Sequence, residues 1–339
     1  MSSNKANKTA DVIIVGGGLA GLSLTALLAT YDVSVICVDR DAPQTQQKTA
    51  YDGRTTAVSF GSRKILKAAG VWNDIAPQTC PIDTIHISDG DSPVLLEFSN
   101  EEVEGEAFGW IAENSFLRQK IYQRVMALPT ATHIAPATVK DFKIHENHAE
   151  VILEDDQILS APLVIGADGR NSFTRDFMGI DTRGWQYKQS AIVCCVTHEH
   201  PHDHVALENF RPEGPLAVLP MRDDEDGNHR SSLVWTEHSD AAQSFLNVSE
   251  DIFNTALNAR FPSHYGQVAL SGKRFSYPLG MIHAHEYTAP RMALIAEAAH
   301  GMHPIAGQGL NMGFRDVAAI ADLIITARKN NEDLSLIHI

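Results

Sequence analysis

Apolar runs separated by turn-forming residues divide the chain into predicted strands and helices. Residues 12–15 are continuously apolar, and residues 33–38 form a second, mostly apolar run. Such runs are typical of strands buried on both faces of a parallel sheet. Between them, a glycine turn precedes a helical stretch, so the chain opens with a predicted β-α-β unit. Residues 163–166 predict a further buried strand, which enters a turn at Asp168 and Gly169.

The segments between these strands carry local helix, strand and turn signals. Residues 55–69 have helical spacing and end at Gly70, and a second helix is expected to begin with Asn114 as its cap and to end before Pro129. Strand patterns lie on both sides of the turn signal Asp89-Gly90-Asp91 and in a later hairpin, at residues 82–88, 94–98, 140–144 and 150–153. We expect residues 1–10 to be a disordered leader and residues 41–53 to be an exposed loop.

The middle of the chain changes to longer alternating runs. Between about residues 185 and 277 these runs predict strands, at 191–196, 205–210 and 232–235, with helices near Ala241 and Ile252. This pattern indicates an antiparallel sheet inserted into the body that the parallel strands form. We therefore expect an α/β fold with a Rossmann-like domain at 11–180, carrying small inserted strands at 82–98, and a second, inserted domain at 181–285. The first domain resumes over 286–339 and ends in a helix at 308–329.

The glycine turn has the spacing Gly16-x-Gly18-x-x-Gly21. Gly16 permits a tight turn, Gly18 lets the backbone approach a pyrophosphate, and Gly21 lets the helix pack closely on the sheet. Asp39 ends the second strand, where a carboxylate accepts hydrogen bonds from a ribose diol. The ligand should be an adenine dinucleotide. The motif alone does not separate FAD from NAD, and a glycine turn that serves only helix packing is the alternative interpretation.

Composition narrows the function classes. The chain has 339 residues, a formal charge of −15 and 44% hydrophobic residues. We see no basic stripe that would overcome this charge, so nucleic acid is not an expected partner. Four cysteines without a CxxC motif favour a reducing, cytoplasmic compartment. No apolar run approaches the roughly 18 residues of a membrane span, so we expect a soluble chain or one peripheral to the inner membrane.

Three separated motifs resemble one family. They are Asp52 to Ser59, Gly166 to Ser172 followed by Arg175, and Ala296 to Asn311, which we call the second flavin motif. Together these motifs resemble the aromatic-ring flavoprotein monooxygenases (class A), and most closely the ubiquinone-biosynthesis hydroxylases. The resemblance implies a fold like that of para-hydroxybenzoate hydroxylase, with a Rossmann-like FAD domain and an inserted antiparallel substrate sheet.

The resemblance also implies which residues bind FAD. The Asp168-Gly169 loop would contact FAD and the nicotinamide cofactor, and Glu297 stands where the family usually has the aspartate of a Gly-Asp pair. The helix start after Pro304 would present backbone N–H groups to the negative flavin pyrimidine ring. The full expected set of cofactor-binding residues is Gly16, Gly18, Gly21, Asp39, Arg54, Arg118, Asp168, Gly169, Glu297, Pro304, Gly307, Gly309, Leu310 and Asn311.

The activity that the resemblance implies is ring hydroxylation of a lipophilic, polyprenylated phenol with NAD(P)H and O₂. No second strand-linked glycine motif offers a resident NAD(P)H site, so the reductant should bind transiently. The inserted sheet should roof an apolar substrate cavity, with Phe210, Leu219 and Pro220 beside Leu216 and Val218. His300 and His303 flank the second flavin motif, where proton transfer is conceivable and structural packing is the favoured interpretation.

Several alternatives stay open. The run His198-Glu-His200-Pro-His202-Asp-His204 could bind a metal, but Pro201 interrupts the strand geometry, so we expect none. A flavin-dependent reductase, cyclase or halogenase would share the glycine motifs, as would a catalytically silent component of a biosynthetic complex. Family members usually continue with further helices beyond the point where this chain stops, so truncation is expected. Association with a membrane or a biosynthetic complex is possible.

Overall fold

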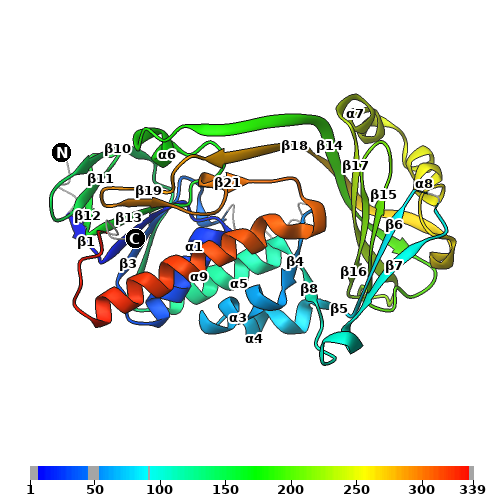
Figure 1. Cartoon of the computed structure of the whole chain (residues 1–339), viewed down its shortest axis with the longest axis horizontal. Helices are drawn as coiled ribbons and strands as arrows, with labels where there is room; N and C mark the ends of the chain where they lie inside the picture. Colours follow the sequence, from blue (N-terminus) through cyan, green and yellow to red (C-terminus); the bar gives the residue numbers. More distant parts are fainter. Residues whose placement is uncertain (1–6, 45–52, 91, 336–339) are drawn as a thin grey trace.

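The computed structural model describes residues 7–44, 53–90 and 92–335 (Figure 1). Several expectations lie partly outside these ranges: most of the 1–10 leader and of the 41–53 loop, Asp52 of the first family motif, Asp91 of the predicted turn, and the last residues from Leu336. Within the described part, Lys8–Thr9 forms strand β1, which pairs with a later strand. The expectation of a disordered leader is therefore wrong for these two residues.

The central layer is a six-stranded sheet in the order β19-β20-β13-β2-β3-β9. Its five longer strands run parallel, as the buried apolar sequences predicted, and only β19 is antiparallel. The strands are β2 (Val12–Val15), β3 (Val35–Val38), β9 (Ala131–Ile134), β13 (Leu163–Gly166), β19 (Thr288–Ala289) and β20 (Met292–Leu294).

Helices cover one face of this sheet and a second sheet covers the other. Figure 1 shows three long helices side by side, α1 (Leu19–Thr30), α5 (Asn114–Ala127) and α9 (Gln308–Lys329). Alternation sends Ile14 toward the helices and Ile13 toward the other side. There lies the four-stranded sheet β1-β12-β11-β10, made of β1, β10 (Val139–Ile144), β11 (Ala149–Leu153) and β12 (Ile158–Ala161). The hairpin expected at 140–144 and 150–153 is confirmed as β10–β11.

The far end of the molecule is an eight-stranded sheet in the order β21-β18-β14-β17-β16-β15-β6-β7. Two long strands, β14 (Thr182–His198) and β18 (Val268–Ala284), run from this sheet back to the first domain (Figure 1). The others are β6 (Thr84–Asp89), β7 (Leu95–Ser99), β15 (Val205–Phe210), β16 (Leu216–Met221), β17 (His229–His238) and β21 (His300–Gly301). Helices α7 (Ser239–Asn247) and α8 (Glu250–Asn258) cover its outer face.

A small sheet, β4-β8-β5, joins the two parts. It consists of β4 (Thr55–Ser59), β5 (Cys80–Ile82) and β8 (Gly109–Glu113). Further short helices are α3 (Phe60–Ala68), α4 (Trp72–Ile75) and α6 (Phe173–Phe177). Short 3₁₀ turns lie at Ala76–Gln78, Asn100–Val103, Ser263–Tyr265, Ala296–Ala298 and Ile305–Gly307. Among the described helices, none is long and apolar enough to cross a membrane.

Three predicted elements need correction. Residues 55–59 are a strand, not the start of a helix, because β4 pairs with β8 and Ser59 caps α3 by accepting a hydrogen bond from Ser62 N. Asn114 is the first residue of α5 and does not cap it, since its Oδ1 accepts from Thr56 Oγ1 at 2.5 Å. The strands near 82–98 belong mainly to the large sheet, where β6 pairs in parallel with β15. That sheet is therefore mixed, not purely antiparallel.

Candidate cofactor and substrate site

One cavity of about 600 Å³ lies at the carboxyl ends of β2, β3 and β13. This is the edge of a parallel sheet where ligands bind. Ten of the expected cofactor residues line the cavity: Gly16, Gly18, Asp39, Arg54, Arg118, Asp168, Gly169, Glu297, Gly309 and Leu310. The three motifs recognised in the sequence therefore meet in one place. Gly21, Pro304, Gly307 and Asn311 are not among the lining residues.

The glycine turn has the geometry that its spacing predicts. Gly16 has φ +110°, and a Cβ there would lie 2.3 Å from the Ala167 carbonyl oxygen. A Cβ on Gly21 would lie 1.9 Å from the Gly16 carbonyl oxygen, so this glycine allows α1 to pack on the turn. By contrast, nothing lies within 4 Å of a Cβ built on Gly18. The open space at Gly18 adjoins the start of α1, whose first turn contains no acidic residue. A phosphate group fits there.

Asp39 lies beside this turn at the end of β3. Its Oδ2 accepts a short hydrogen bond from Gly17 N, and its Oδ1 accepts from Asp41 N at 2.7 Å. The carboxylate is buried and lines the cavity. These bonds fix its orientation while leaving further lone pairs on each oxygen. Arg40, the next residue, also lines the cavity, although the motif did not single it out.

The Asp168 loop is held by its own side chains. Asp168 Oδ1 accepts from Ser172 Oγ at 2.5 Å, and its Oδ2 accepts from Thr174 N at 2.9 Å. The nearly buried Arg175 donates to the Ala298 carbonyl oxygen at 3.1 Å, which ties this loop to the second flavin motif. Arg175 belongs to the motif that begins at Gly166, but the sequence assigns it no role. Its role in the structure is to hold the two walls of the cavity together.

The Ala296–Glu297 turn departs from a relaxed backbone. Ala296 has φ +52°, the left-handed region that glycine adopts without steric cost. Its N–H donates to Asp316 Oδ2 at 2.8 Å, and His300 Nε2 bonds the same oxygen at 2.6 Å. Asp316 therefore anchors this turn to α9 while Glu297 lines the cavity. His300 is buried in this network, and the choice between structural packing and proton transfer stays a prediction.

The expected cofactor residues at the start of α9 differ in whether they line the cavity. Gly309 and Leu310 line the cavity, but Asn311 is 1% exposed and points into the protein. Its Oδ1 accepts from Ser59 N and Ser62 Oγ, and its Nδ2 donates to the carbonyl oxygens of Ala57 and Gly307. The Asn311 side chain is therefore not available to a cofactor, and the expected contribution of its backbone N–H to flavin binding stays a prediction. This side chain instead joins α9 to β4 and α3.

Strand alternation decides which side chains of the large sheet face the first domain. Leu219 packs in a cluster with Ala57 and Ile111 of the small sheet. Leu216 and Val218 pack on the opposite side, with Trp235 and Phe253 under α7 and α8. Pro220 shares their side of the strand by alternation. The expectation of a cavity roof is therefore wrong for Leu216, Val218 and Pro220.

Phe210 ends β15 and is 38% exposed. Alternation places it on the same side of the sheet as Ala206, whose partners in the core are Leu219 and Ile111. The side chain therefore belongs to the face turned toward the first domain, but at the outer part of that face. Its direct pairing partner is Asp89 of β6.

Two contacts join this face of the sheet to the cavity. Thr55 Oγ1 donates to Ser232 Oγ at 2.8 Å. Arg54, which lines the cavity, lies over the ring of Tyr277 at 5.5 Å. The cofactor cavity and the inner face of the large sheet are therefore neighbours.

His303 lies at the edge of this region. Its ring contacts Tyr187 edge-on, with 5.3 Å between ring centroids. Burial lowers the pKa of His303, and its Nδ1 is buried without a hydrogen-bond partner among the described residues. At neutral pH the ring is therefore uncharged, so it can accept a proton but is a poor donor of one.

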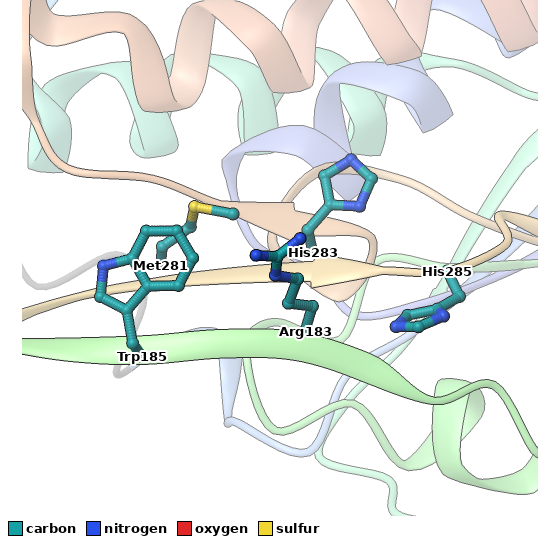
Figure 2. A pocket seen from close by; sticks show the side chains of 5 residues that line it. All are labelled: Arg183, Trp185, Met281, His283 and His285. Atoms are coloured by element: carbon teal, nitrogen blue, oxygen red, sulfur yellow. The ribbon is translucent and has the colours of Figure 1, made fainter.

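A second hollow of about 460 Å³ lies on the long strands that connect the two domains. Figure 2 shows its five side chains, two from β14, two from β18 and His285 just beyond the end of β18. Trp185 pairs with Met281, and Arg183 pairs with His283, so these four share one face of the ribbon. His285 is the fifth. The sequence pattern does not predict this hollow, because it depends on the register between two distant strands.

The histidine-rich run uses its rings for hydrogen bonds. His198 bonds the carbonyl oxygen of His200 and Ser231 Oγ, and His202 bonds the Met221 carbonyl oxygen. His204 bonds Asp83 Oδ2 at 2.7 Å. Among the described residues, the group with ligand atoms close enough for a metal is elsewhere, at His145, His148 and Glu150 on the β10–β11 hairpin.

Comparison with known proteins agrees with this geometry. A family model described as "FAD binding domain" matches residues 9–337. The chain is 42% identical over 327 residues to the ubiquinone hydroxylase UbiL of Rhodospirillum rubrum, covering 96% of this chain and 75% of that protein. The chain belongs to this family of FAD-dependent hydroxylases. It is also 32% identical to the 3-demethoxyubiquinol 3-hydroxylase of Escherichia coli, over 96% of this chain and 82% of the relative.

Solved structures share the fold of this hydroxylase. PqsL of Pseudomonas aeruginosa, in complex with 2-aminobenzoylacetate, superimposes with a TM-score of 0.82 at 21% identity, covering 96% of this chain and 89% of that one. The p-nitrophenol 4-monooxygenase PnpA of Pseudomonas putida gives 0.76 at 18% identity, covering 98% and 85%. The expected fold class, an FAD domain with an inserted sheet domain, is therefore confirmed.

Proposed function

We propose that this hydroxylase adds one oxygen atom from O₂ to the aromatic ring of a lipophilic, prenylated phenol, with NAD(P)H as the reductant. One observation carries the proposal: a single cavity is lined by the glycine turn, the Asp168 loop and the start of α9, and it adjoins an apolar sheet face through Arg54. The relatives named for ubiquinone hydroxylation support the choice of a quinone precursor.

Each wall of the cavity has a task in binding the cofactor. The open turn at Gly18 and the start of α1 receive the pyrophosphate, and Asp39 accepts hydrogen bonds from a ribose. Arg54 and Arg118 line the cavity and add positive charge. When bound, FAD would supply the redox chemistry, which is acceptance of a hydride from the reductant and transfer of oxygen to an electron-rich ring. The chain orients the ring and excludes water from the site.

The reductant should bind transiently. The sequence has no second strand-linked glycine turn of the kind that binds the pyrophosphate at Gly18. NAD(P)H would therefore reach the flavin from outside the cavity and leave after reduction. A fall in flavin absorbance on mixing with NADH or NADPH would support this reductant. A flavin reduced by dithionite but by neither nucleotide would contradict it.

We further propose that the chain meets its lipophilic substrate at the cytoplasmic surface of a membrane. The edge strand β7 exposes Leu95 (48%), Leu96 (52%) and Phe98 (40%), and Val94 beside it is 72% exposed. Exposed apolar patches of this kind mark sites of association. The patch lies on β7, which pairs with β6 of the substrate sheet, so a tail entering there would approach the inner face of that sheet.

The experiment that tests the proposed reaction is quinone analysis of a strain that lacks the gene. We expect a prenylated precursor that lacks one ring oxygen to accumulate, and expression of the wild-type chain to restore the mature quinone. The mass and fragmentation of the precursor identify the ring position. Normal quinone content in the deletion strain would contradict the proposal. So would a precursor blocked at a step other than hydroxylation.

A further inference from the structure

Glu208 is a carboxyl group in an apolar part of the substrate sheet. It lies in β15 between Leu207, which packs toward α7 and α8, and Asn209. Successive side chains of a strand point to opposite faces. Glu208 therefore shares the face of Ala206, which packs with Leu219 and Ile111. This is the face turned toward the FAD domain.

The immediate neighbours of Glu208 on this face are apolar. Its cross-strand partners are Ile87 of β6 and Ala217 of β16. Beyond Ala217, the same row continues through Val234 of β17 and Val193 of β14. The side chain is half-buried, and among the described residues no hydrogen bond or ion pair satisfies its carboxyl group.

Other charged groups on this face are at its ends. Alternation places Asp89 of β6 beside Phe210 at the outer end. At the inner end, Arg230 of β17 is paired with Glu113 of the small sheet at 2.9 Å. β16 contributes Ala217 and Leu219, which carry no charge. Burial raises the pKa of Glu208 to about 7, so the group titrates near neutral pH.

The row that contains Glu208 leads to the cofactor cavity. Val193 of β14 pairs with Phe275 of β18, and two residues along the same strands Ala191 pairs with Tyr277. Arg54 covers the Tyr277 ring and also lines the cofactor cavity. The row therefore forms an apolar surface between Glu208 and the part of the sheet that adjoins the cofactor cavity.

We propose that Glu208 is a catalytic residue, which binds the phenol hydroxyl of the substrate and takes its proton as oxygen is transferred to the ring. This proposal rests on the proposed function. The phenol O–H bond breaks, its electron pair stays on the oxygen and enriches the ring, and the proton forms a new O–H bond on the carboxylate. The proton passes to water when the product leaves. A general base is most effective when its pKa lies near the working pH.

The test compares Glu208→Gln and Glu208→Leu in the FAD-loaded protein. Glutamine keeps the size and the hydrogen-bonding ability of the side chain but cannot take the proton, and leucine removes both properties. Glu213→Gln, on the exposed turn after β15, is the matched control, since it removes the same charge a few residues away. The probes are a short-chain 2-prenylphenol and its methyl ether. Binding is followed by the change in flavin absorbance, and hydroxylation is followed from about pH 6 to about pH 8.

We expect the wild type and the Glu213 variant to prefer the phenol over its ether and to hydroxylate faster as pH rises through about 7, because only the ionised carboxylate accepts a proton. Glu208→Gln should keep the preference for the phenol, lose this rise, and fall about a hundredfold in rate at the higher pH. Glu208→Leu should bind the phenol and the ether equally.

Two results would overturn the proposal in distinguishable ways. If Glu208→Gln hydroxylates at the rate and with the pH profile of the wild type, Glu208 is not the proton acceptor, and the proposed function stands. If no phenol accelerates NAD(P)H oxidation by the wild type or changes its flavin spectrum, the proposed function fails, and the role of Glu208 fails with it. Full FAD absorbance in each variant shows that the fold is intact.

Discussion

Ala296 has a left-handed backbone conformation, which glycine adopts without steric cost, and it stands where the family motif usually has glycine. A non-glycine residue in this conformation costs about 1–2 kcal/mol, and here it is held by the bond from Ala296 N to Asp316. The turn nevertheless presents Glu297 to the cofactor cavity. The replacement of Gly-Asp by Ala-Glu therefore has a backbone cost that the sequence alone did not reveal.

Ala296→Gly should stabilise the protein. Removing the Cβ relieves the strain, and the greater freedom of glycine in the unfolded chain offsets about half of the gain. We expect a net increase of about 0.5–1 kcal/mol in the free energy of unfolding, measured by urea titration of the FAD-loaded protein. A variant less stable than the wild type would show that Ala296 is not strained in this conformation.

Asn311→Leu should destabilise the fold although its side chain does not line the cavity. The substitution leaves two buried carbonyl oxygens and two donors without their partner, at a cost of about 2–4 kcal/mol. Asn330→Leu, at the exposed end of the same helix, should change little. Urea unfolding measures both. Equal stability of the two variants would contradict the structural role of Asn311.

The sequence predicts which residues lie near the cavity, but it does not predict where every side chain points. Gly16, Gly18 and Asp39 were placed correctly at the cavity because a β-α-β unit fixes them by local geometry. The side-chain role of Asn311 was not predicted, because its partners, Ser59 and Ser62, come from about 250 residues earlier in the chain. Glu208 was overlooked, since alternation gives two possible faces and only the pairing of β15 chooses between them.

At the scale of elements, the unit β2–turn–α1 assigns separate tasks to its glycines. Gly21 serves packing, since a Cβ there would meet backbone at 1.9 Å, and Gly18 faces open space. Residues 55–59 show how pairing overrides local spacing: their helical pattern is real, but β8 offers a full set of hydrogen bonds to a strand. The small sheet formed in this way carries Arg54 to the cavity.

Gly18→Ala and Gly21→Ala should separate cofactor binding from folding. The Gly18 variant should keep the thermal stability of the cofactor-free protein but lose at least about tenfold in FAD affinity, because its methyl group enters the phosphate site. The Gly21 variant should lose stability, since α1 must move off the turn. Thermal unfolding without FAD and titration with FAD measure the two effects. Unchanged FAD affinity in the Gly18 variant would remove this turn from the cofactor site.

At the scale of the whole molecule, two 17-residue strands, β14 and β18, carry the substrate sheet at a distance from the FAD domain and return the chain to it. The arrangement brings an apolar sheet face opposite the cofactor cavity and leaves the edge strand β7 at the other limit of the same sheet. The order of the domains was predictable from the change in hydrophobic period. The membership of β6 and β7 in the distant sheet was not, because it depends on a long-range parallel pairing with β15.

The exposed edge gives a prediction for membrane binding. Leu96→Glu should weaken co-flotation of the protein with uncharged phosphatidylcholine vesicles, because it places a charge in the apolar patch. Ile252→Glu, at a side chain that is 57% exposed on α8, is the matched control and should float like the wild type. Equal flotation of both variants, or none by the wild type, would show that the β7 edge is not a membrane contact.

The most direct test of the central claim is the fate of molecular oxygen in the purified, FAD-loaded protein. With NAD(P)H, a prenylated phenol and ¹⁸O₂, the account predicts a ring-hydroxylated product that carries one ¹⁸O atom, identified by mass spectrometry. A product that takes its oxygen from water would contradict the account. So would NAD(P)H oxidation that yields only hydrogen peroxide at every pH and with every phenol tested.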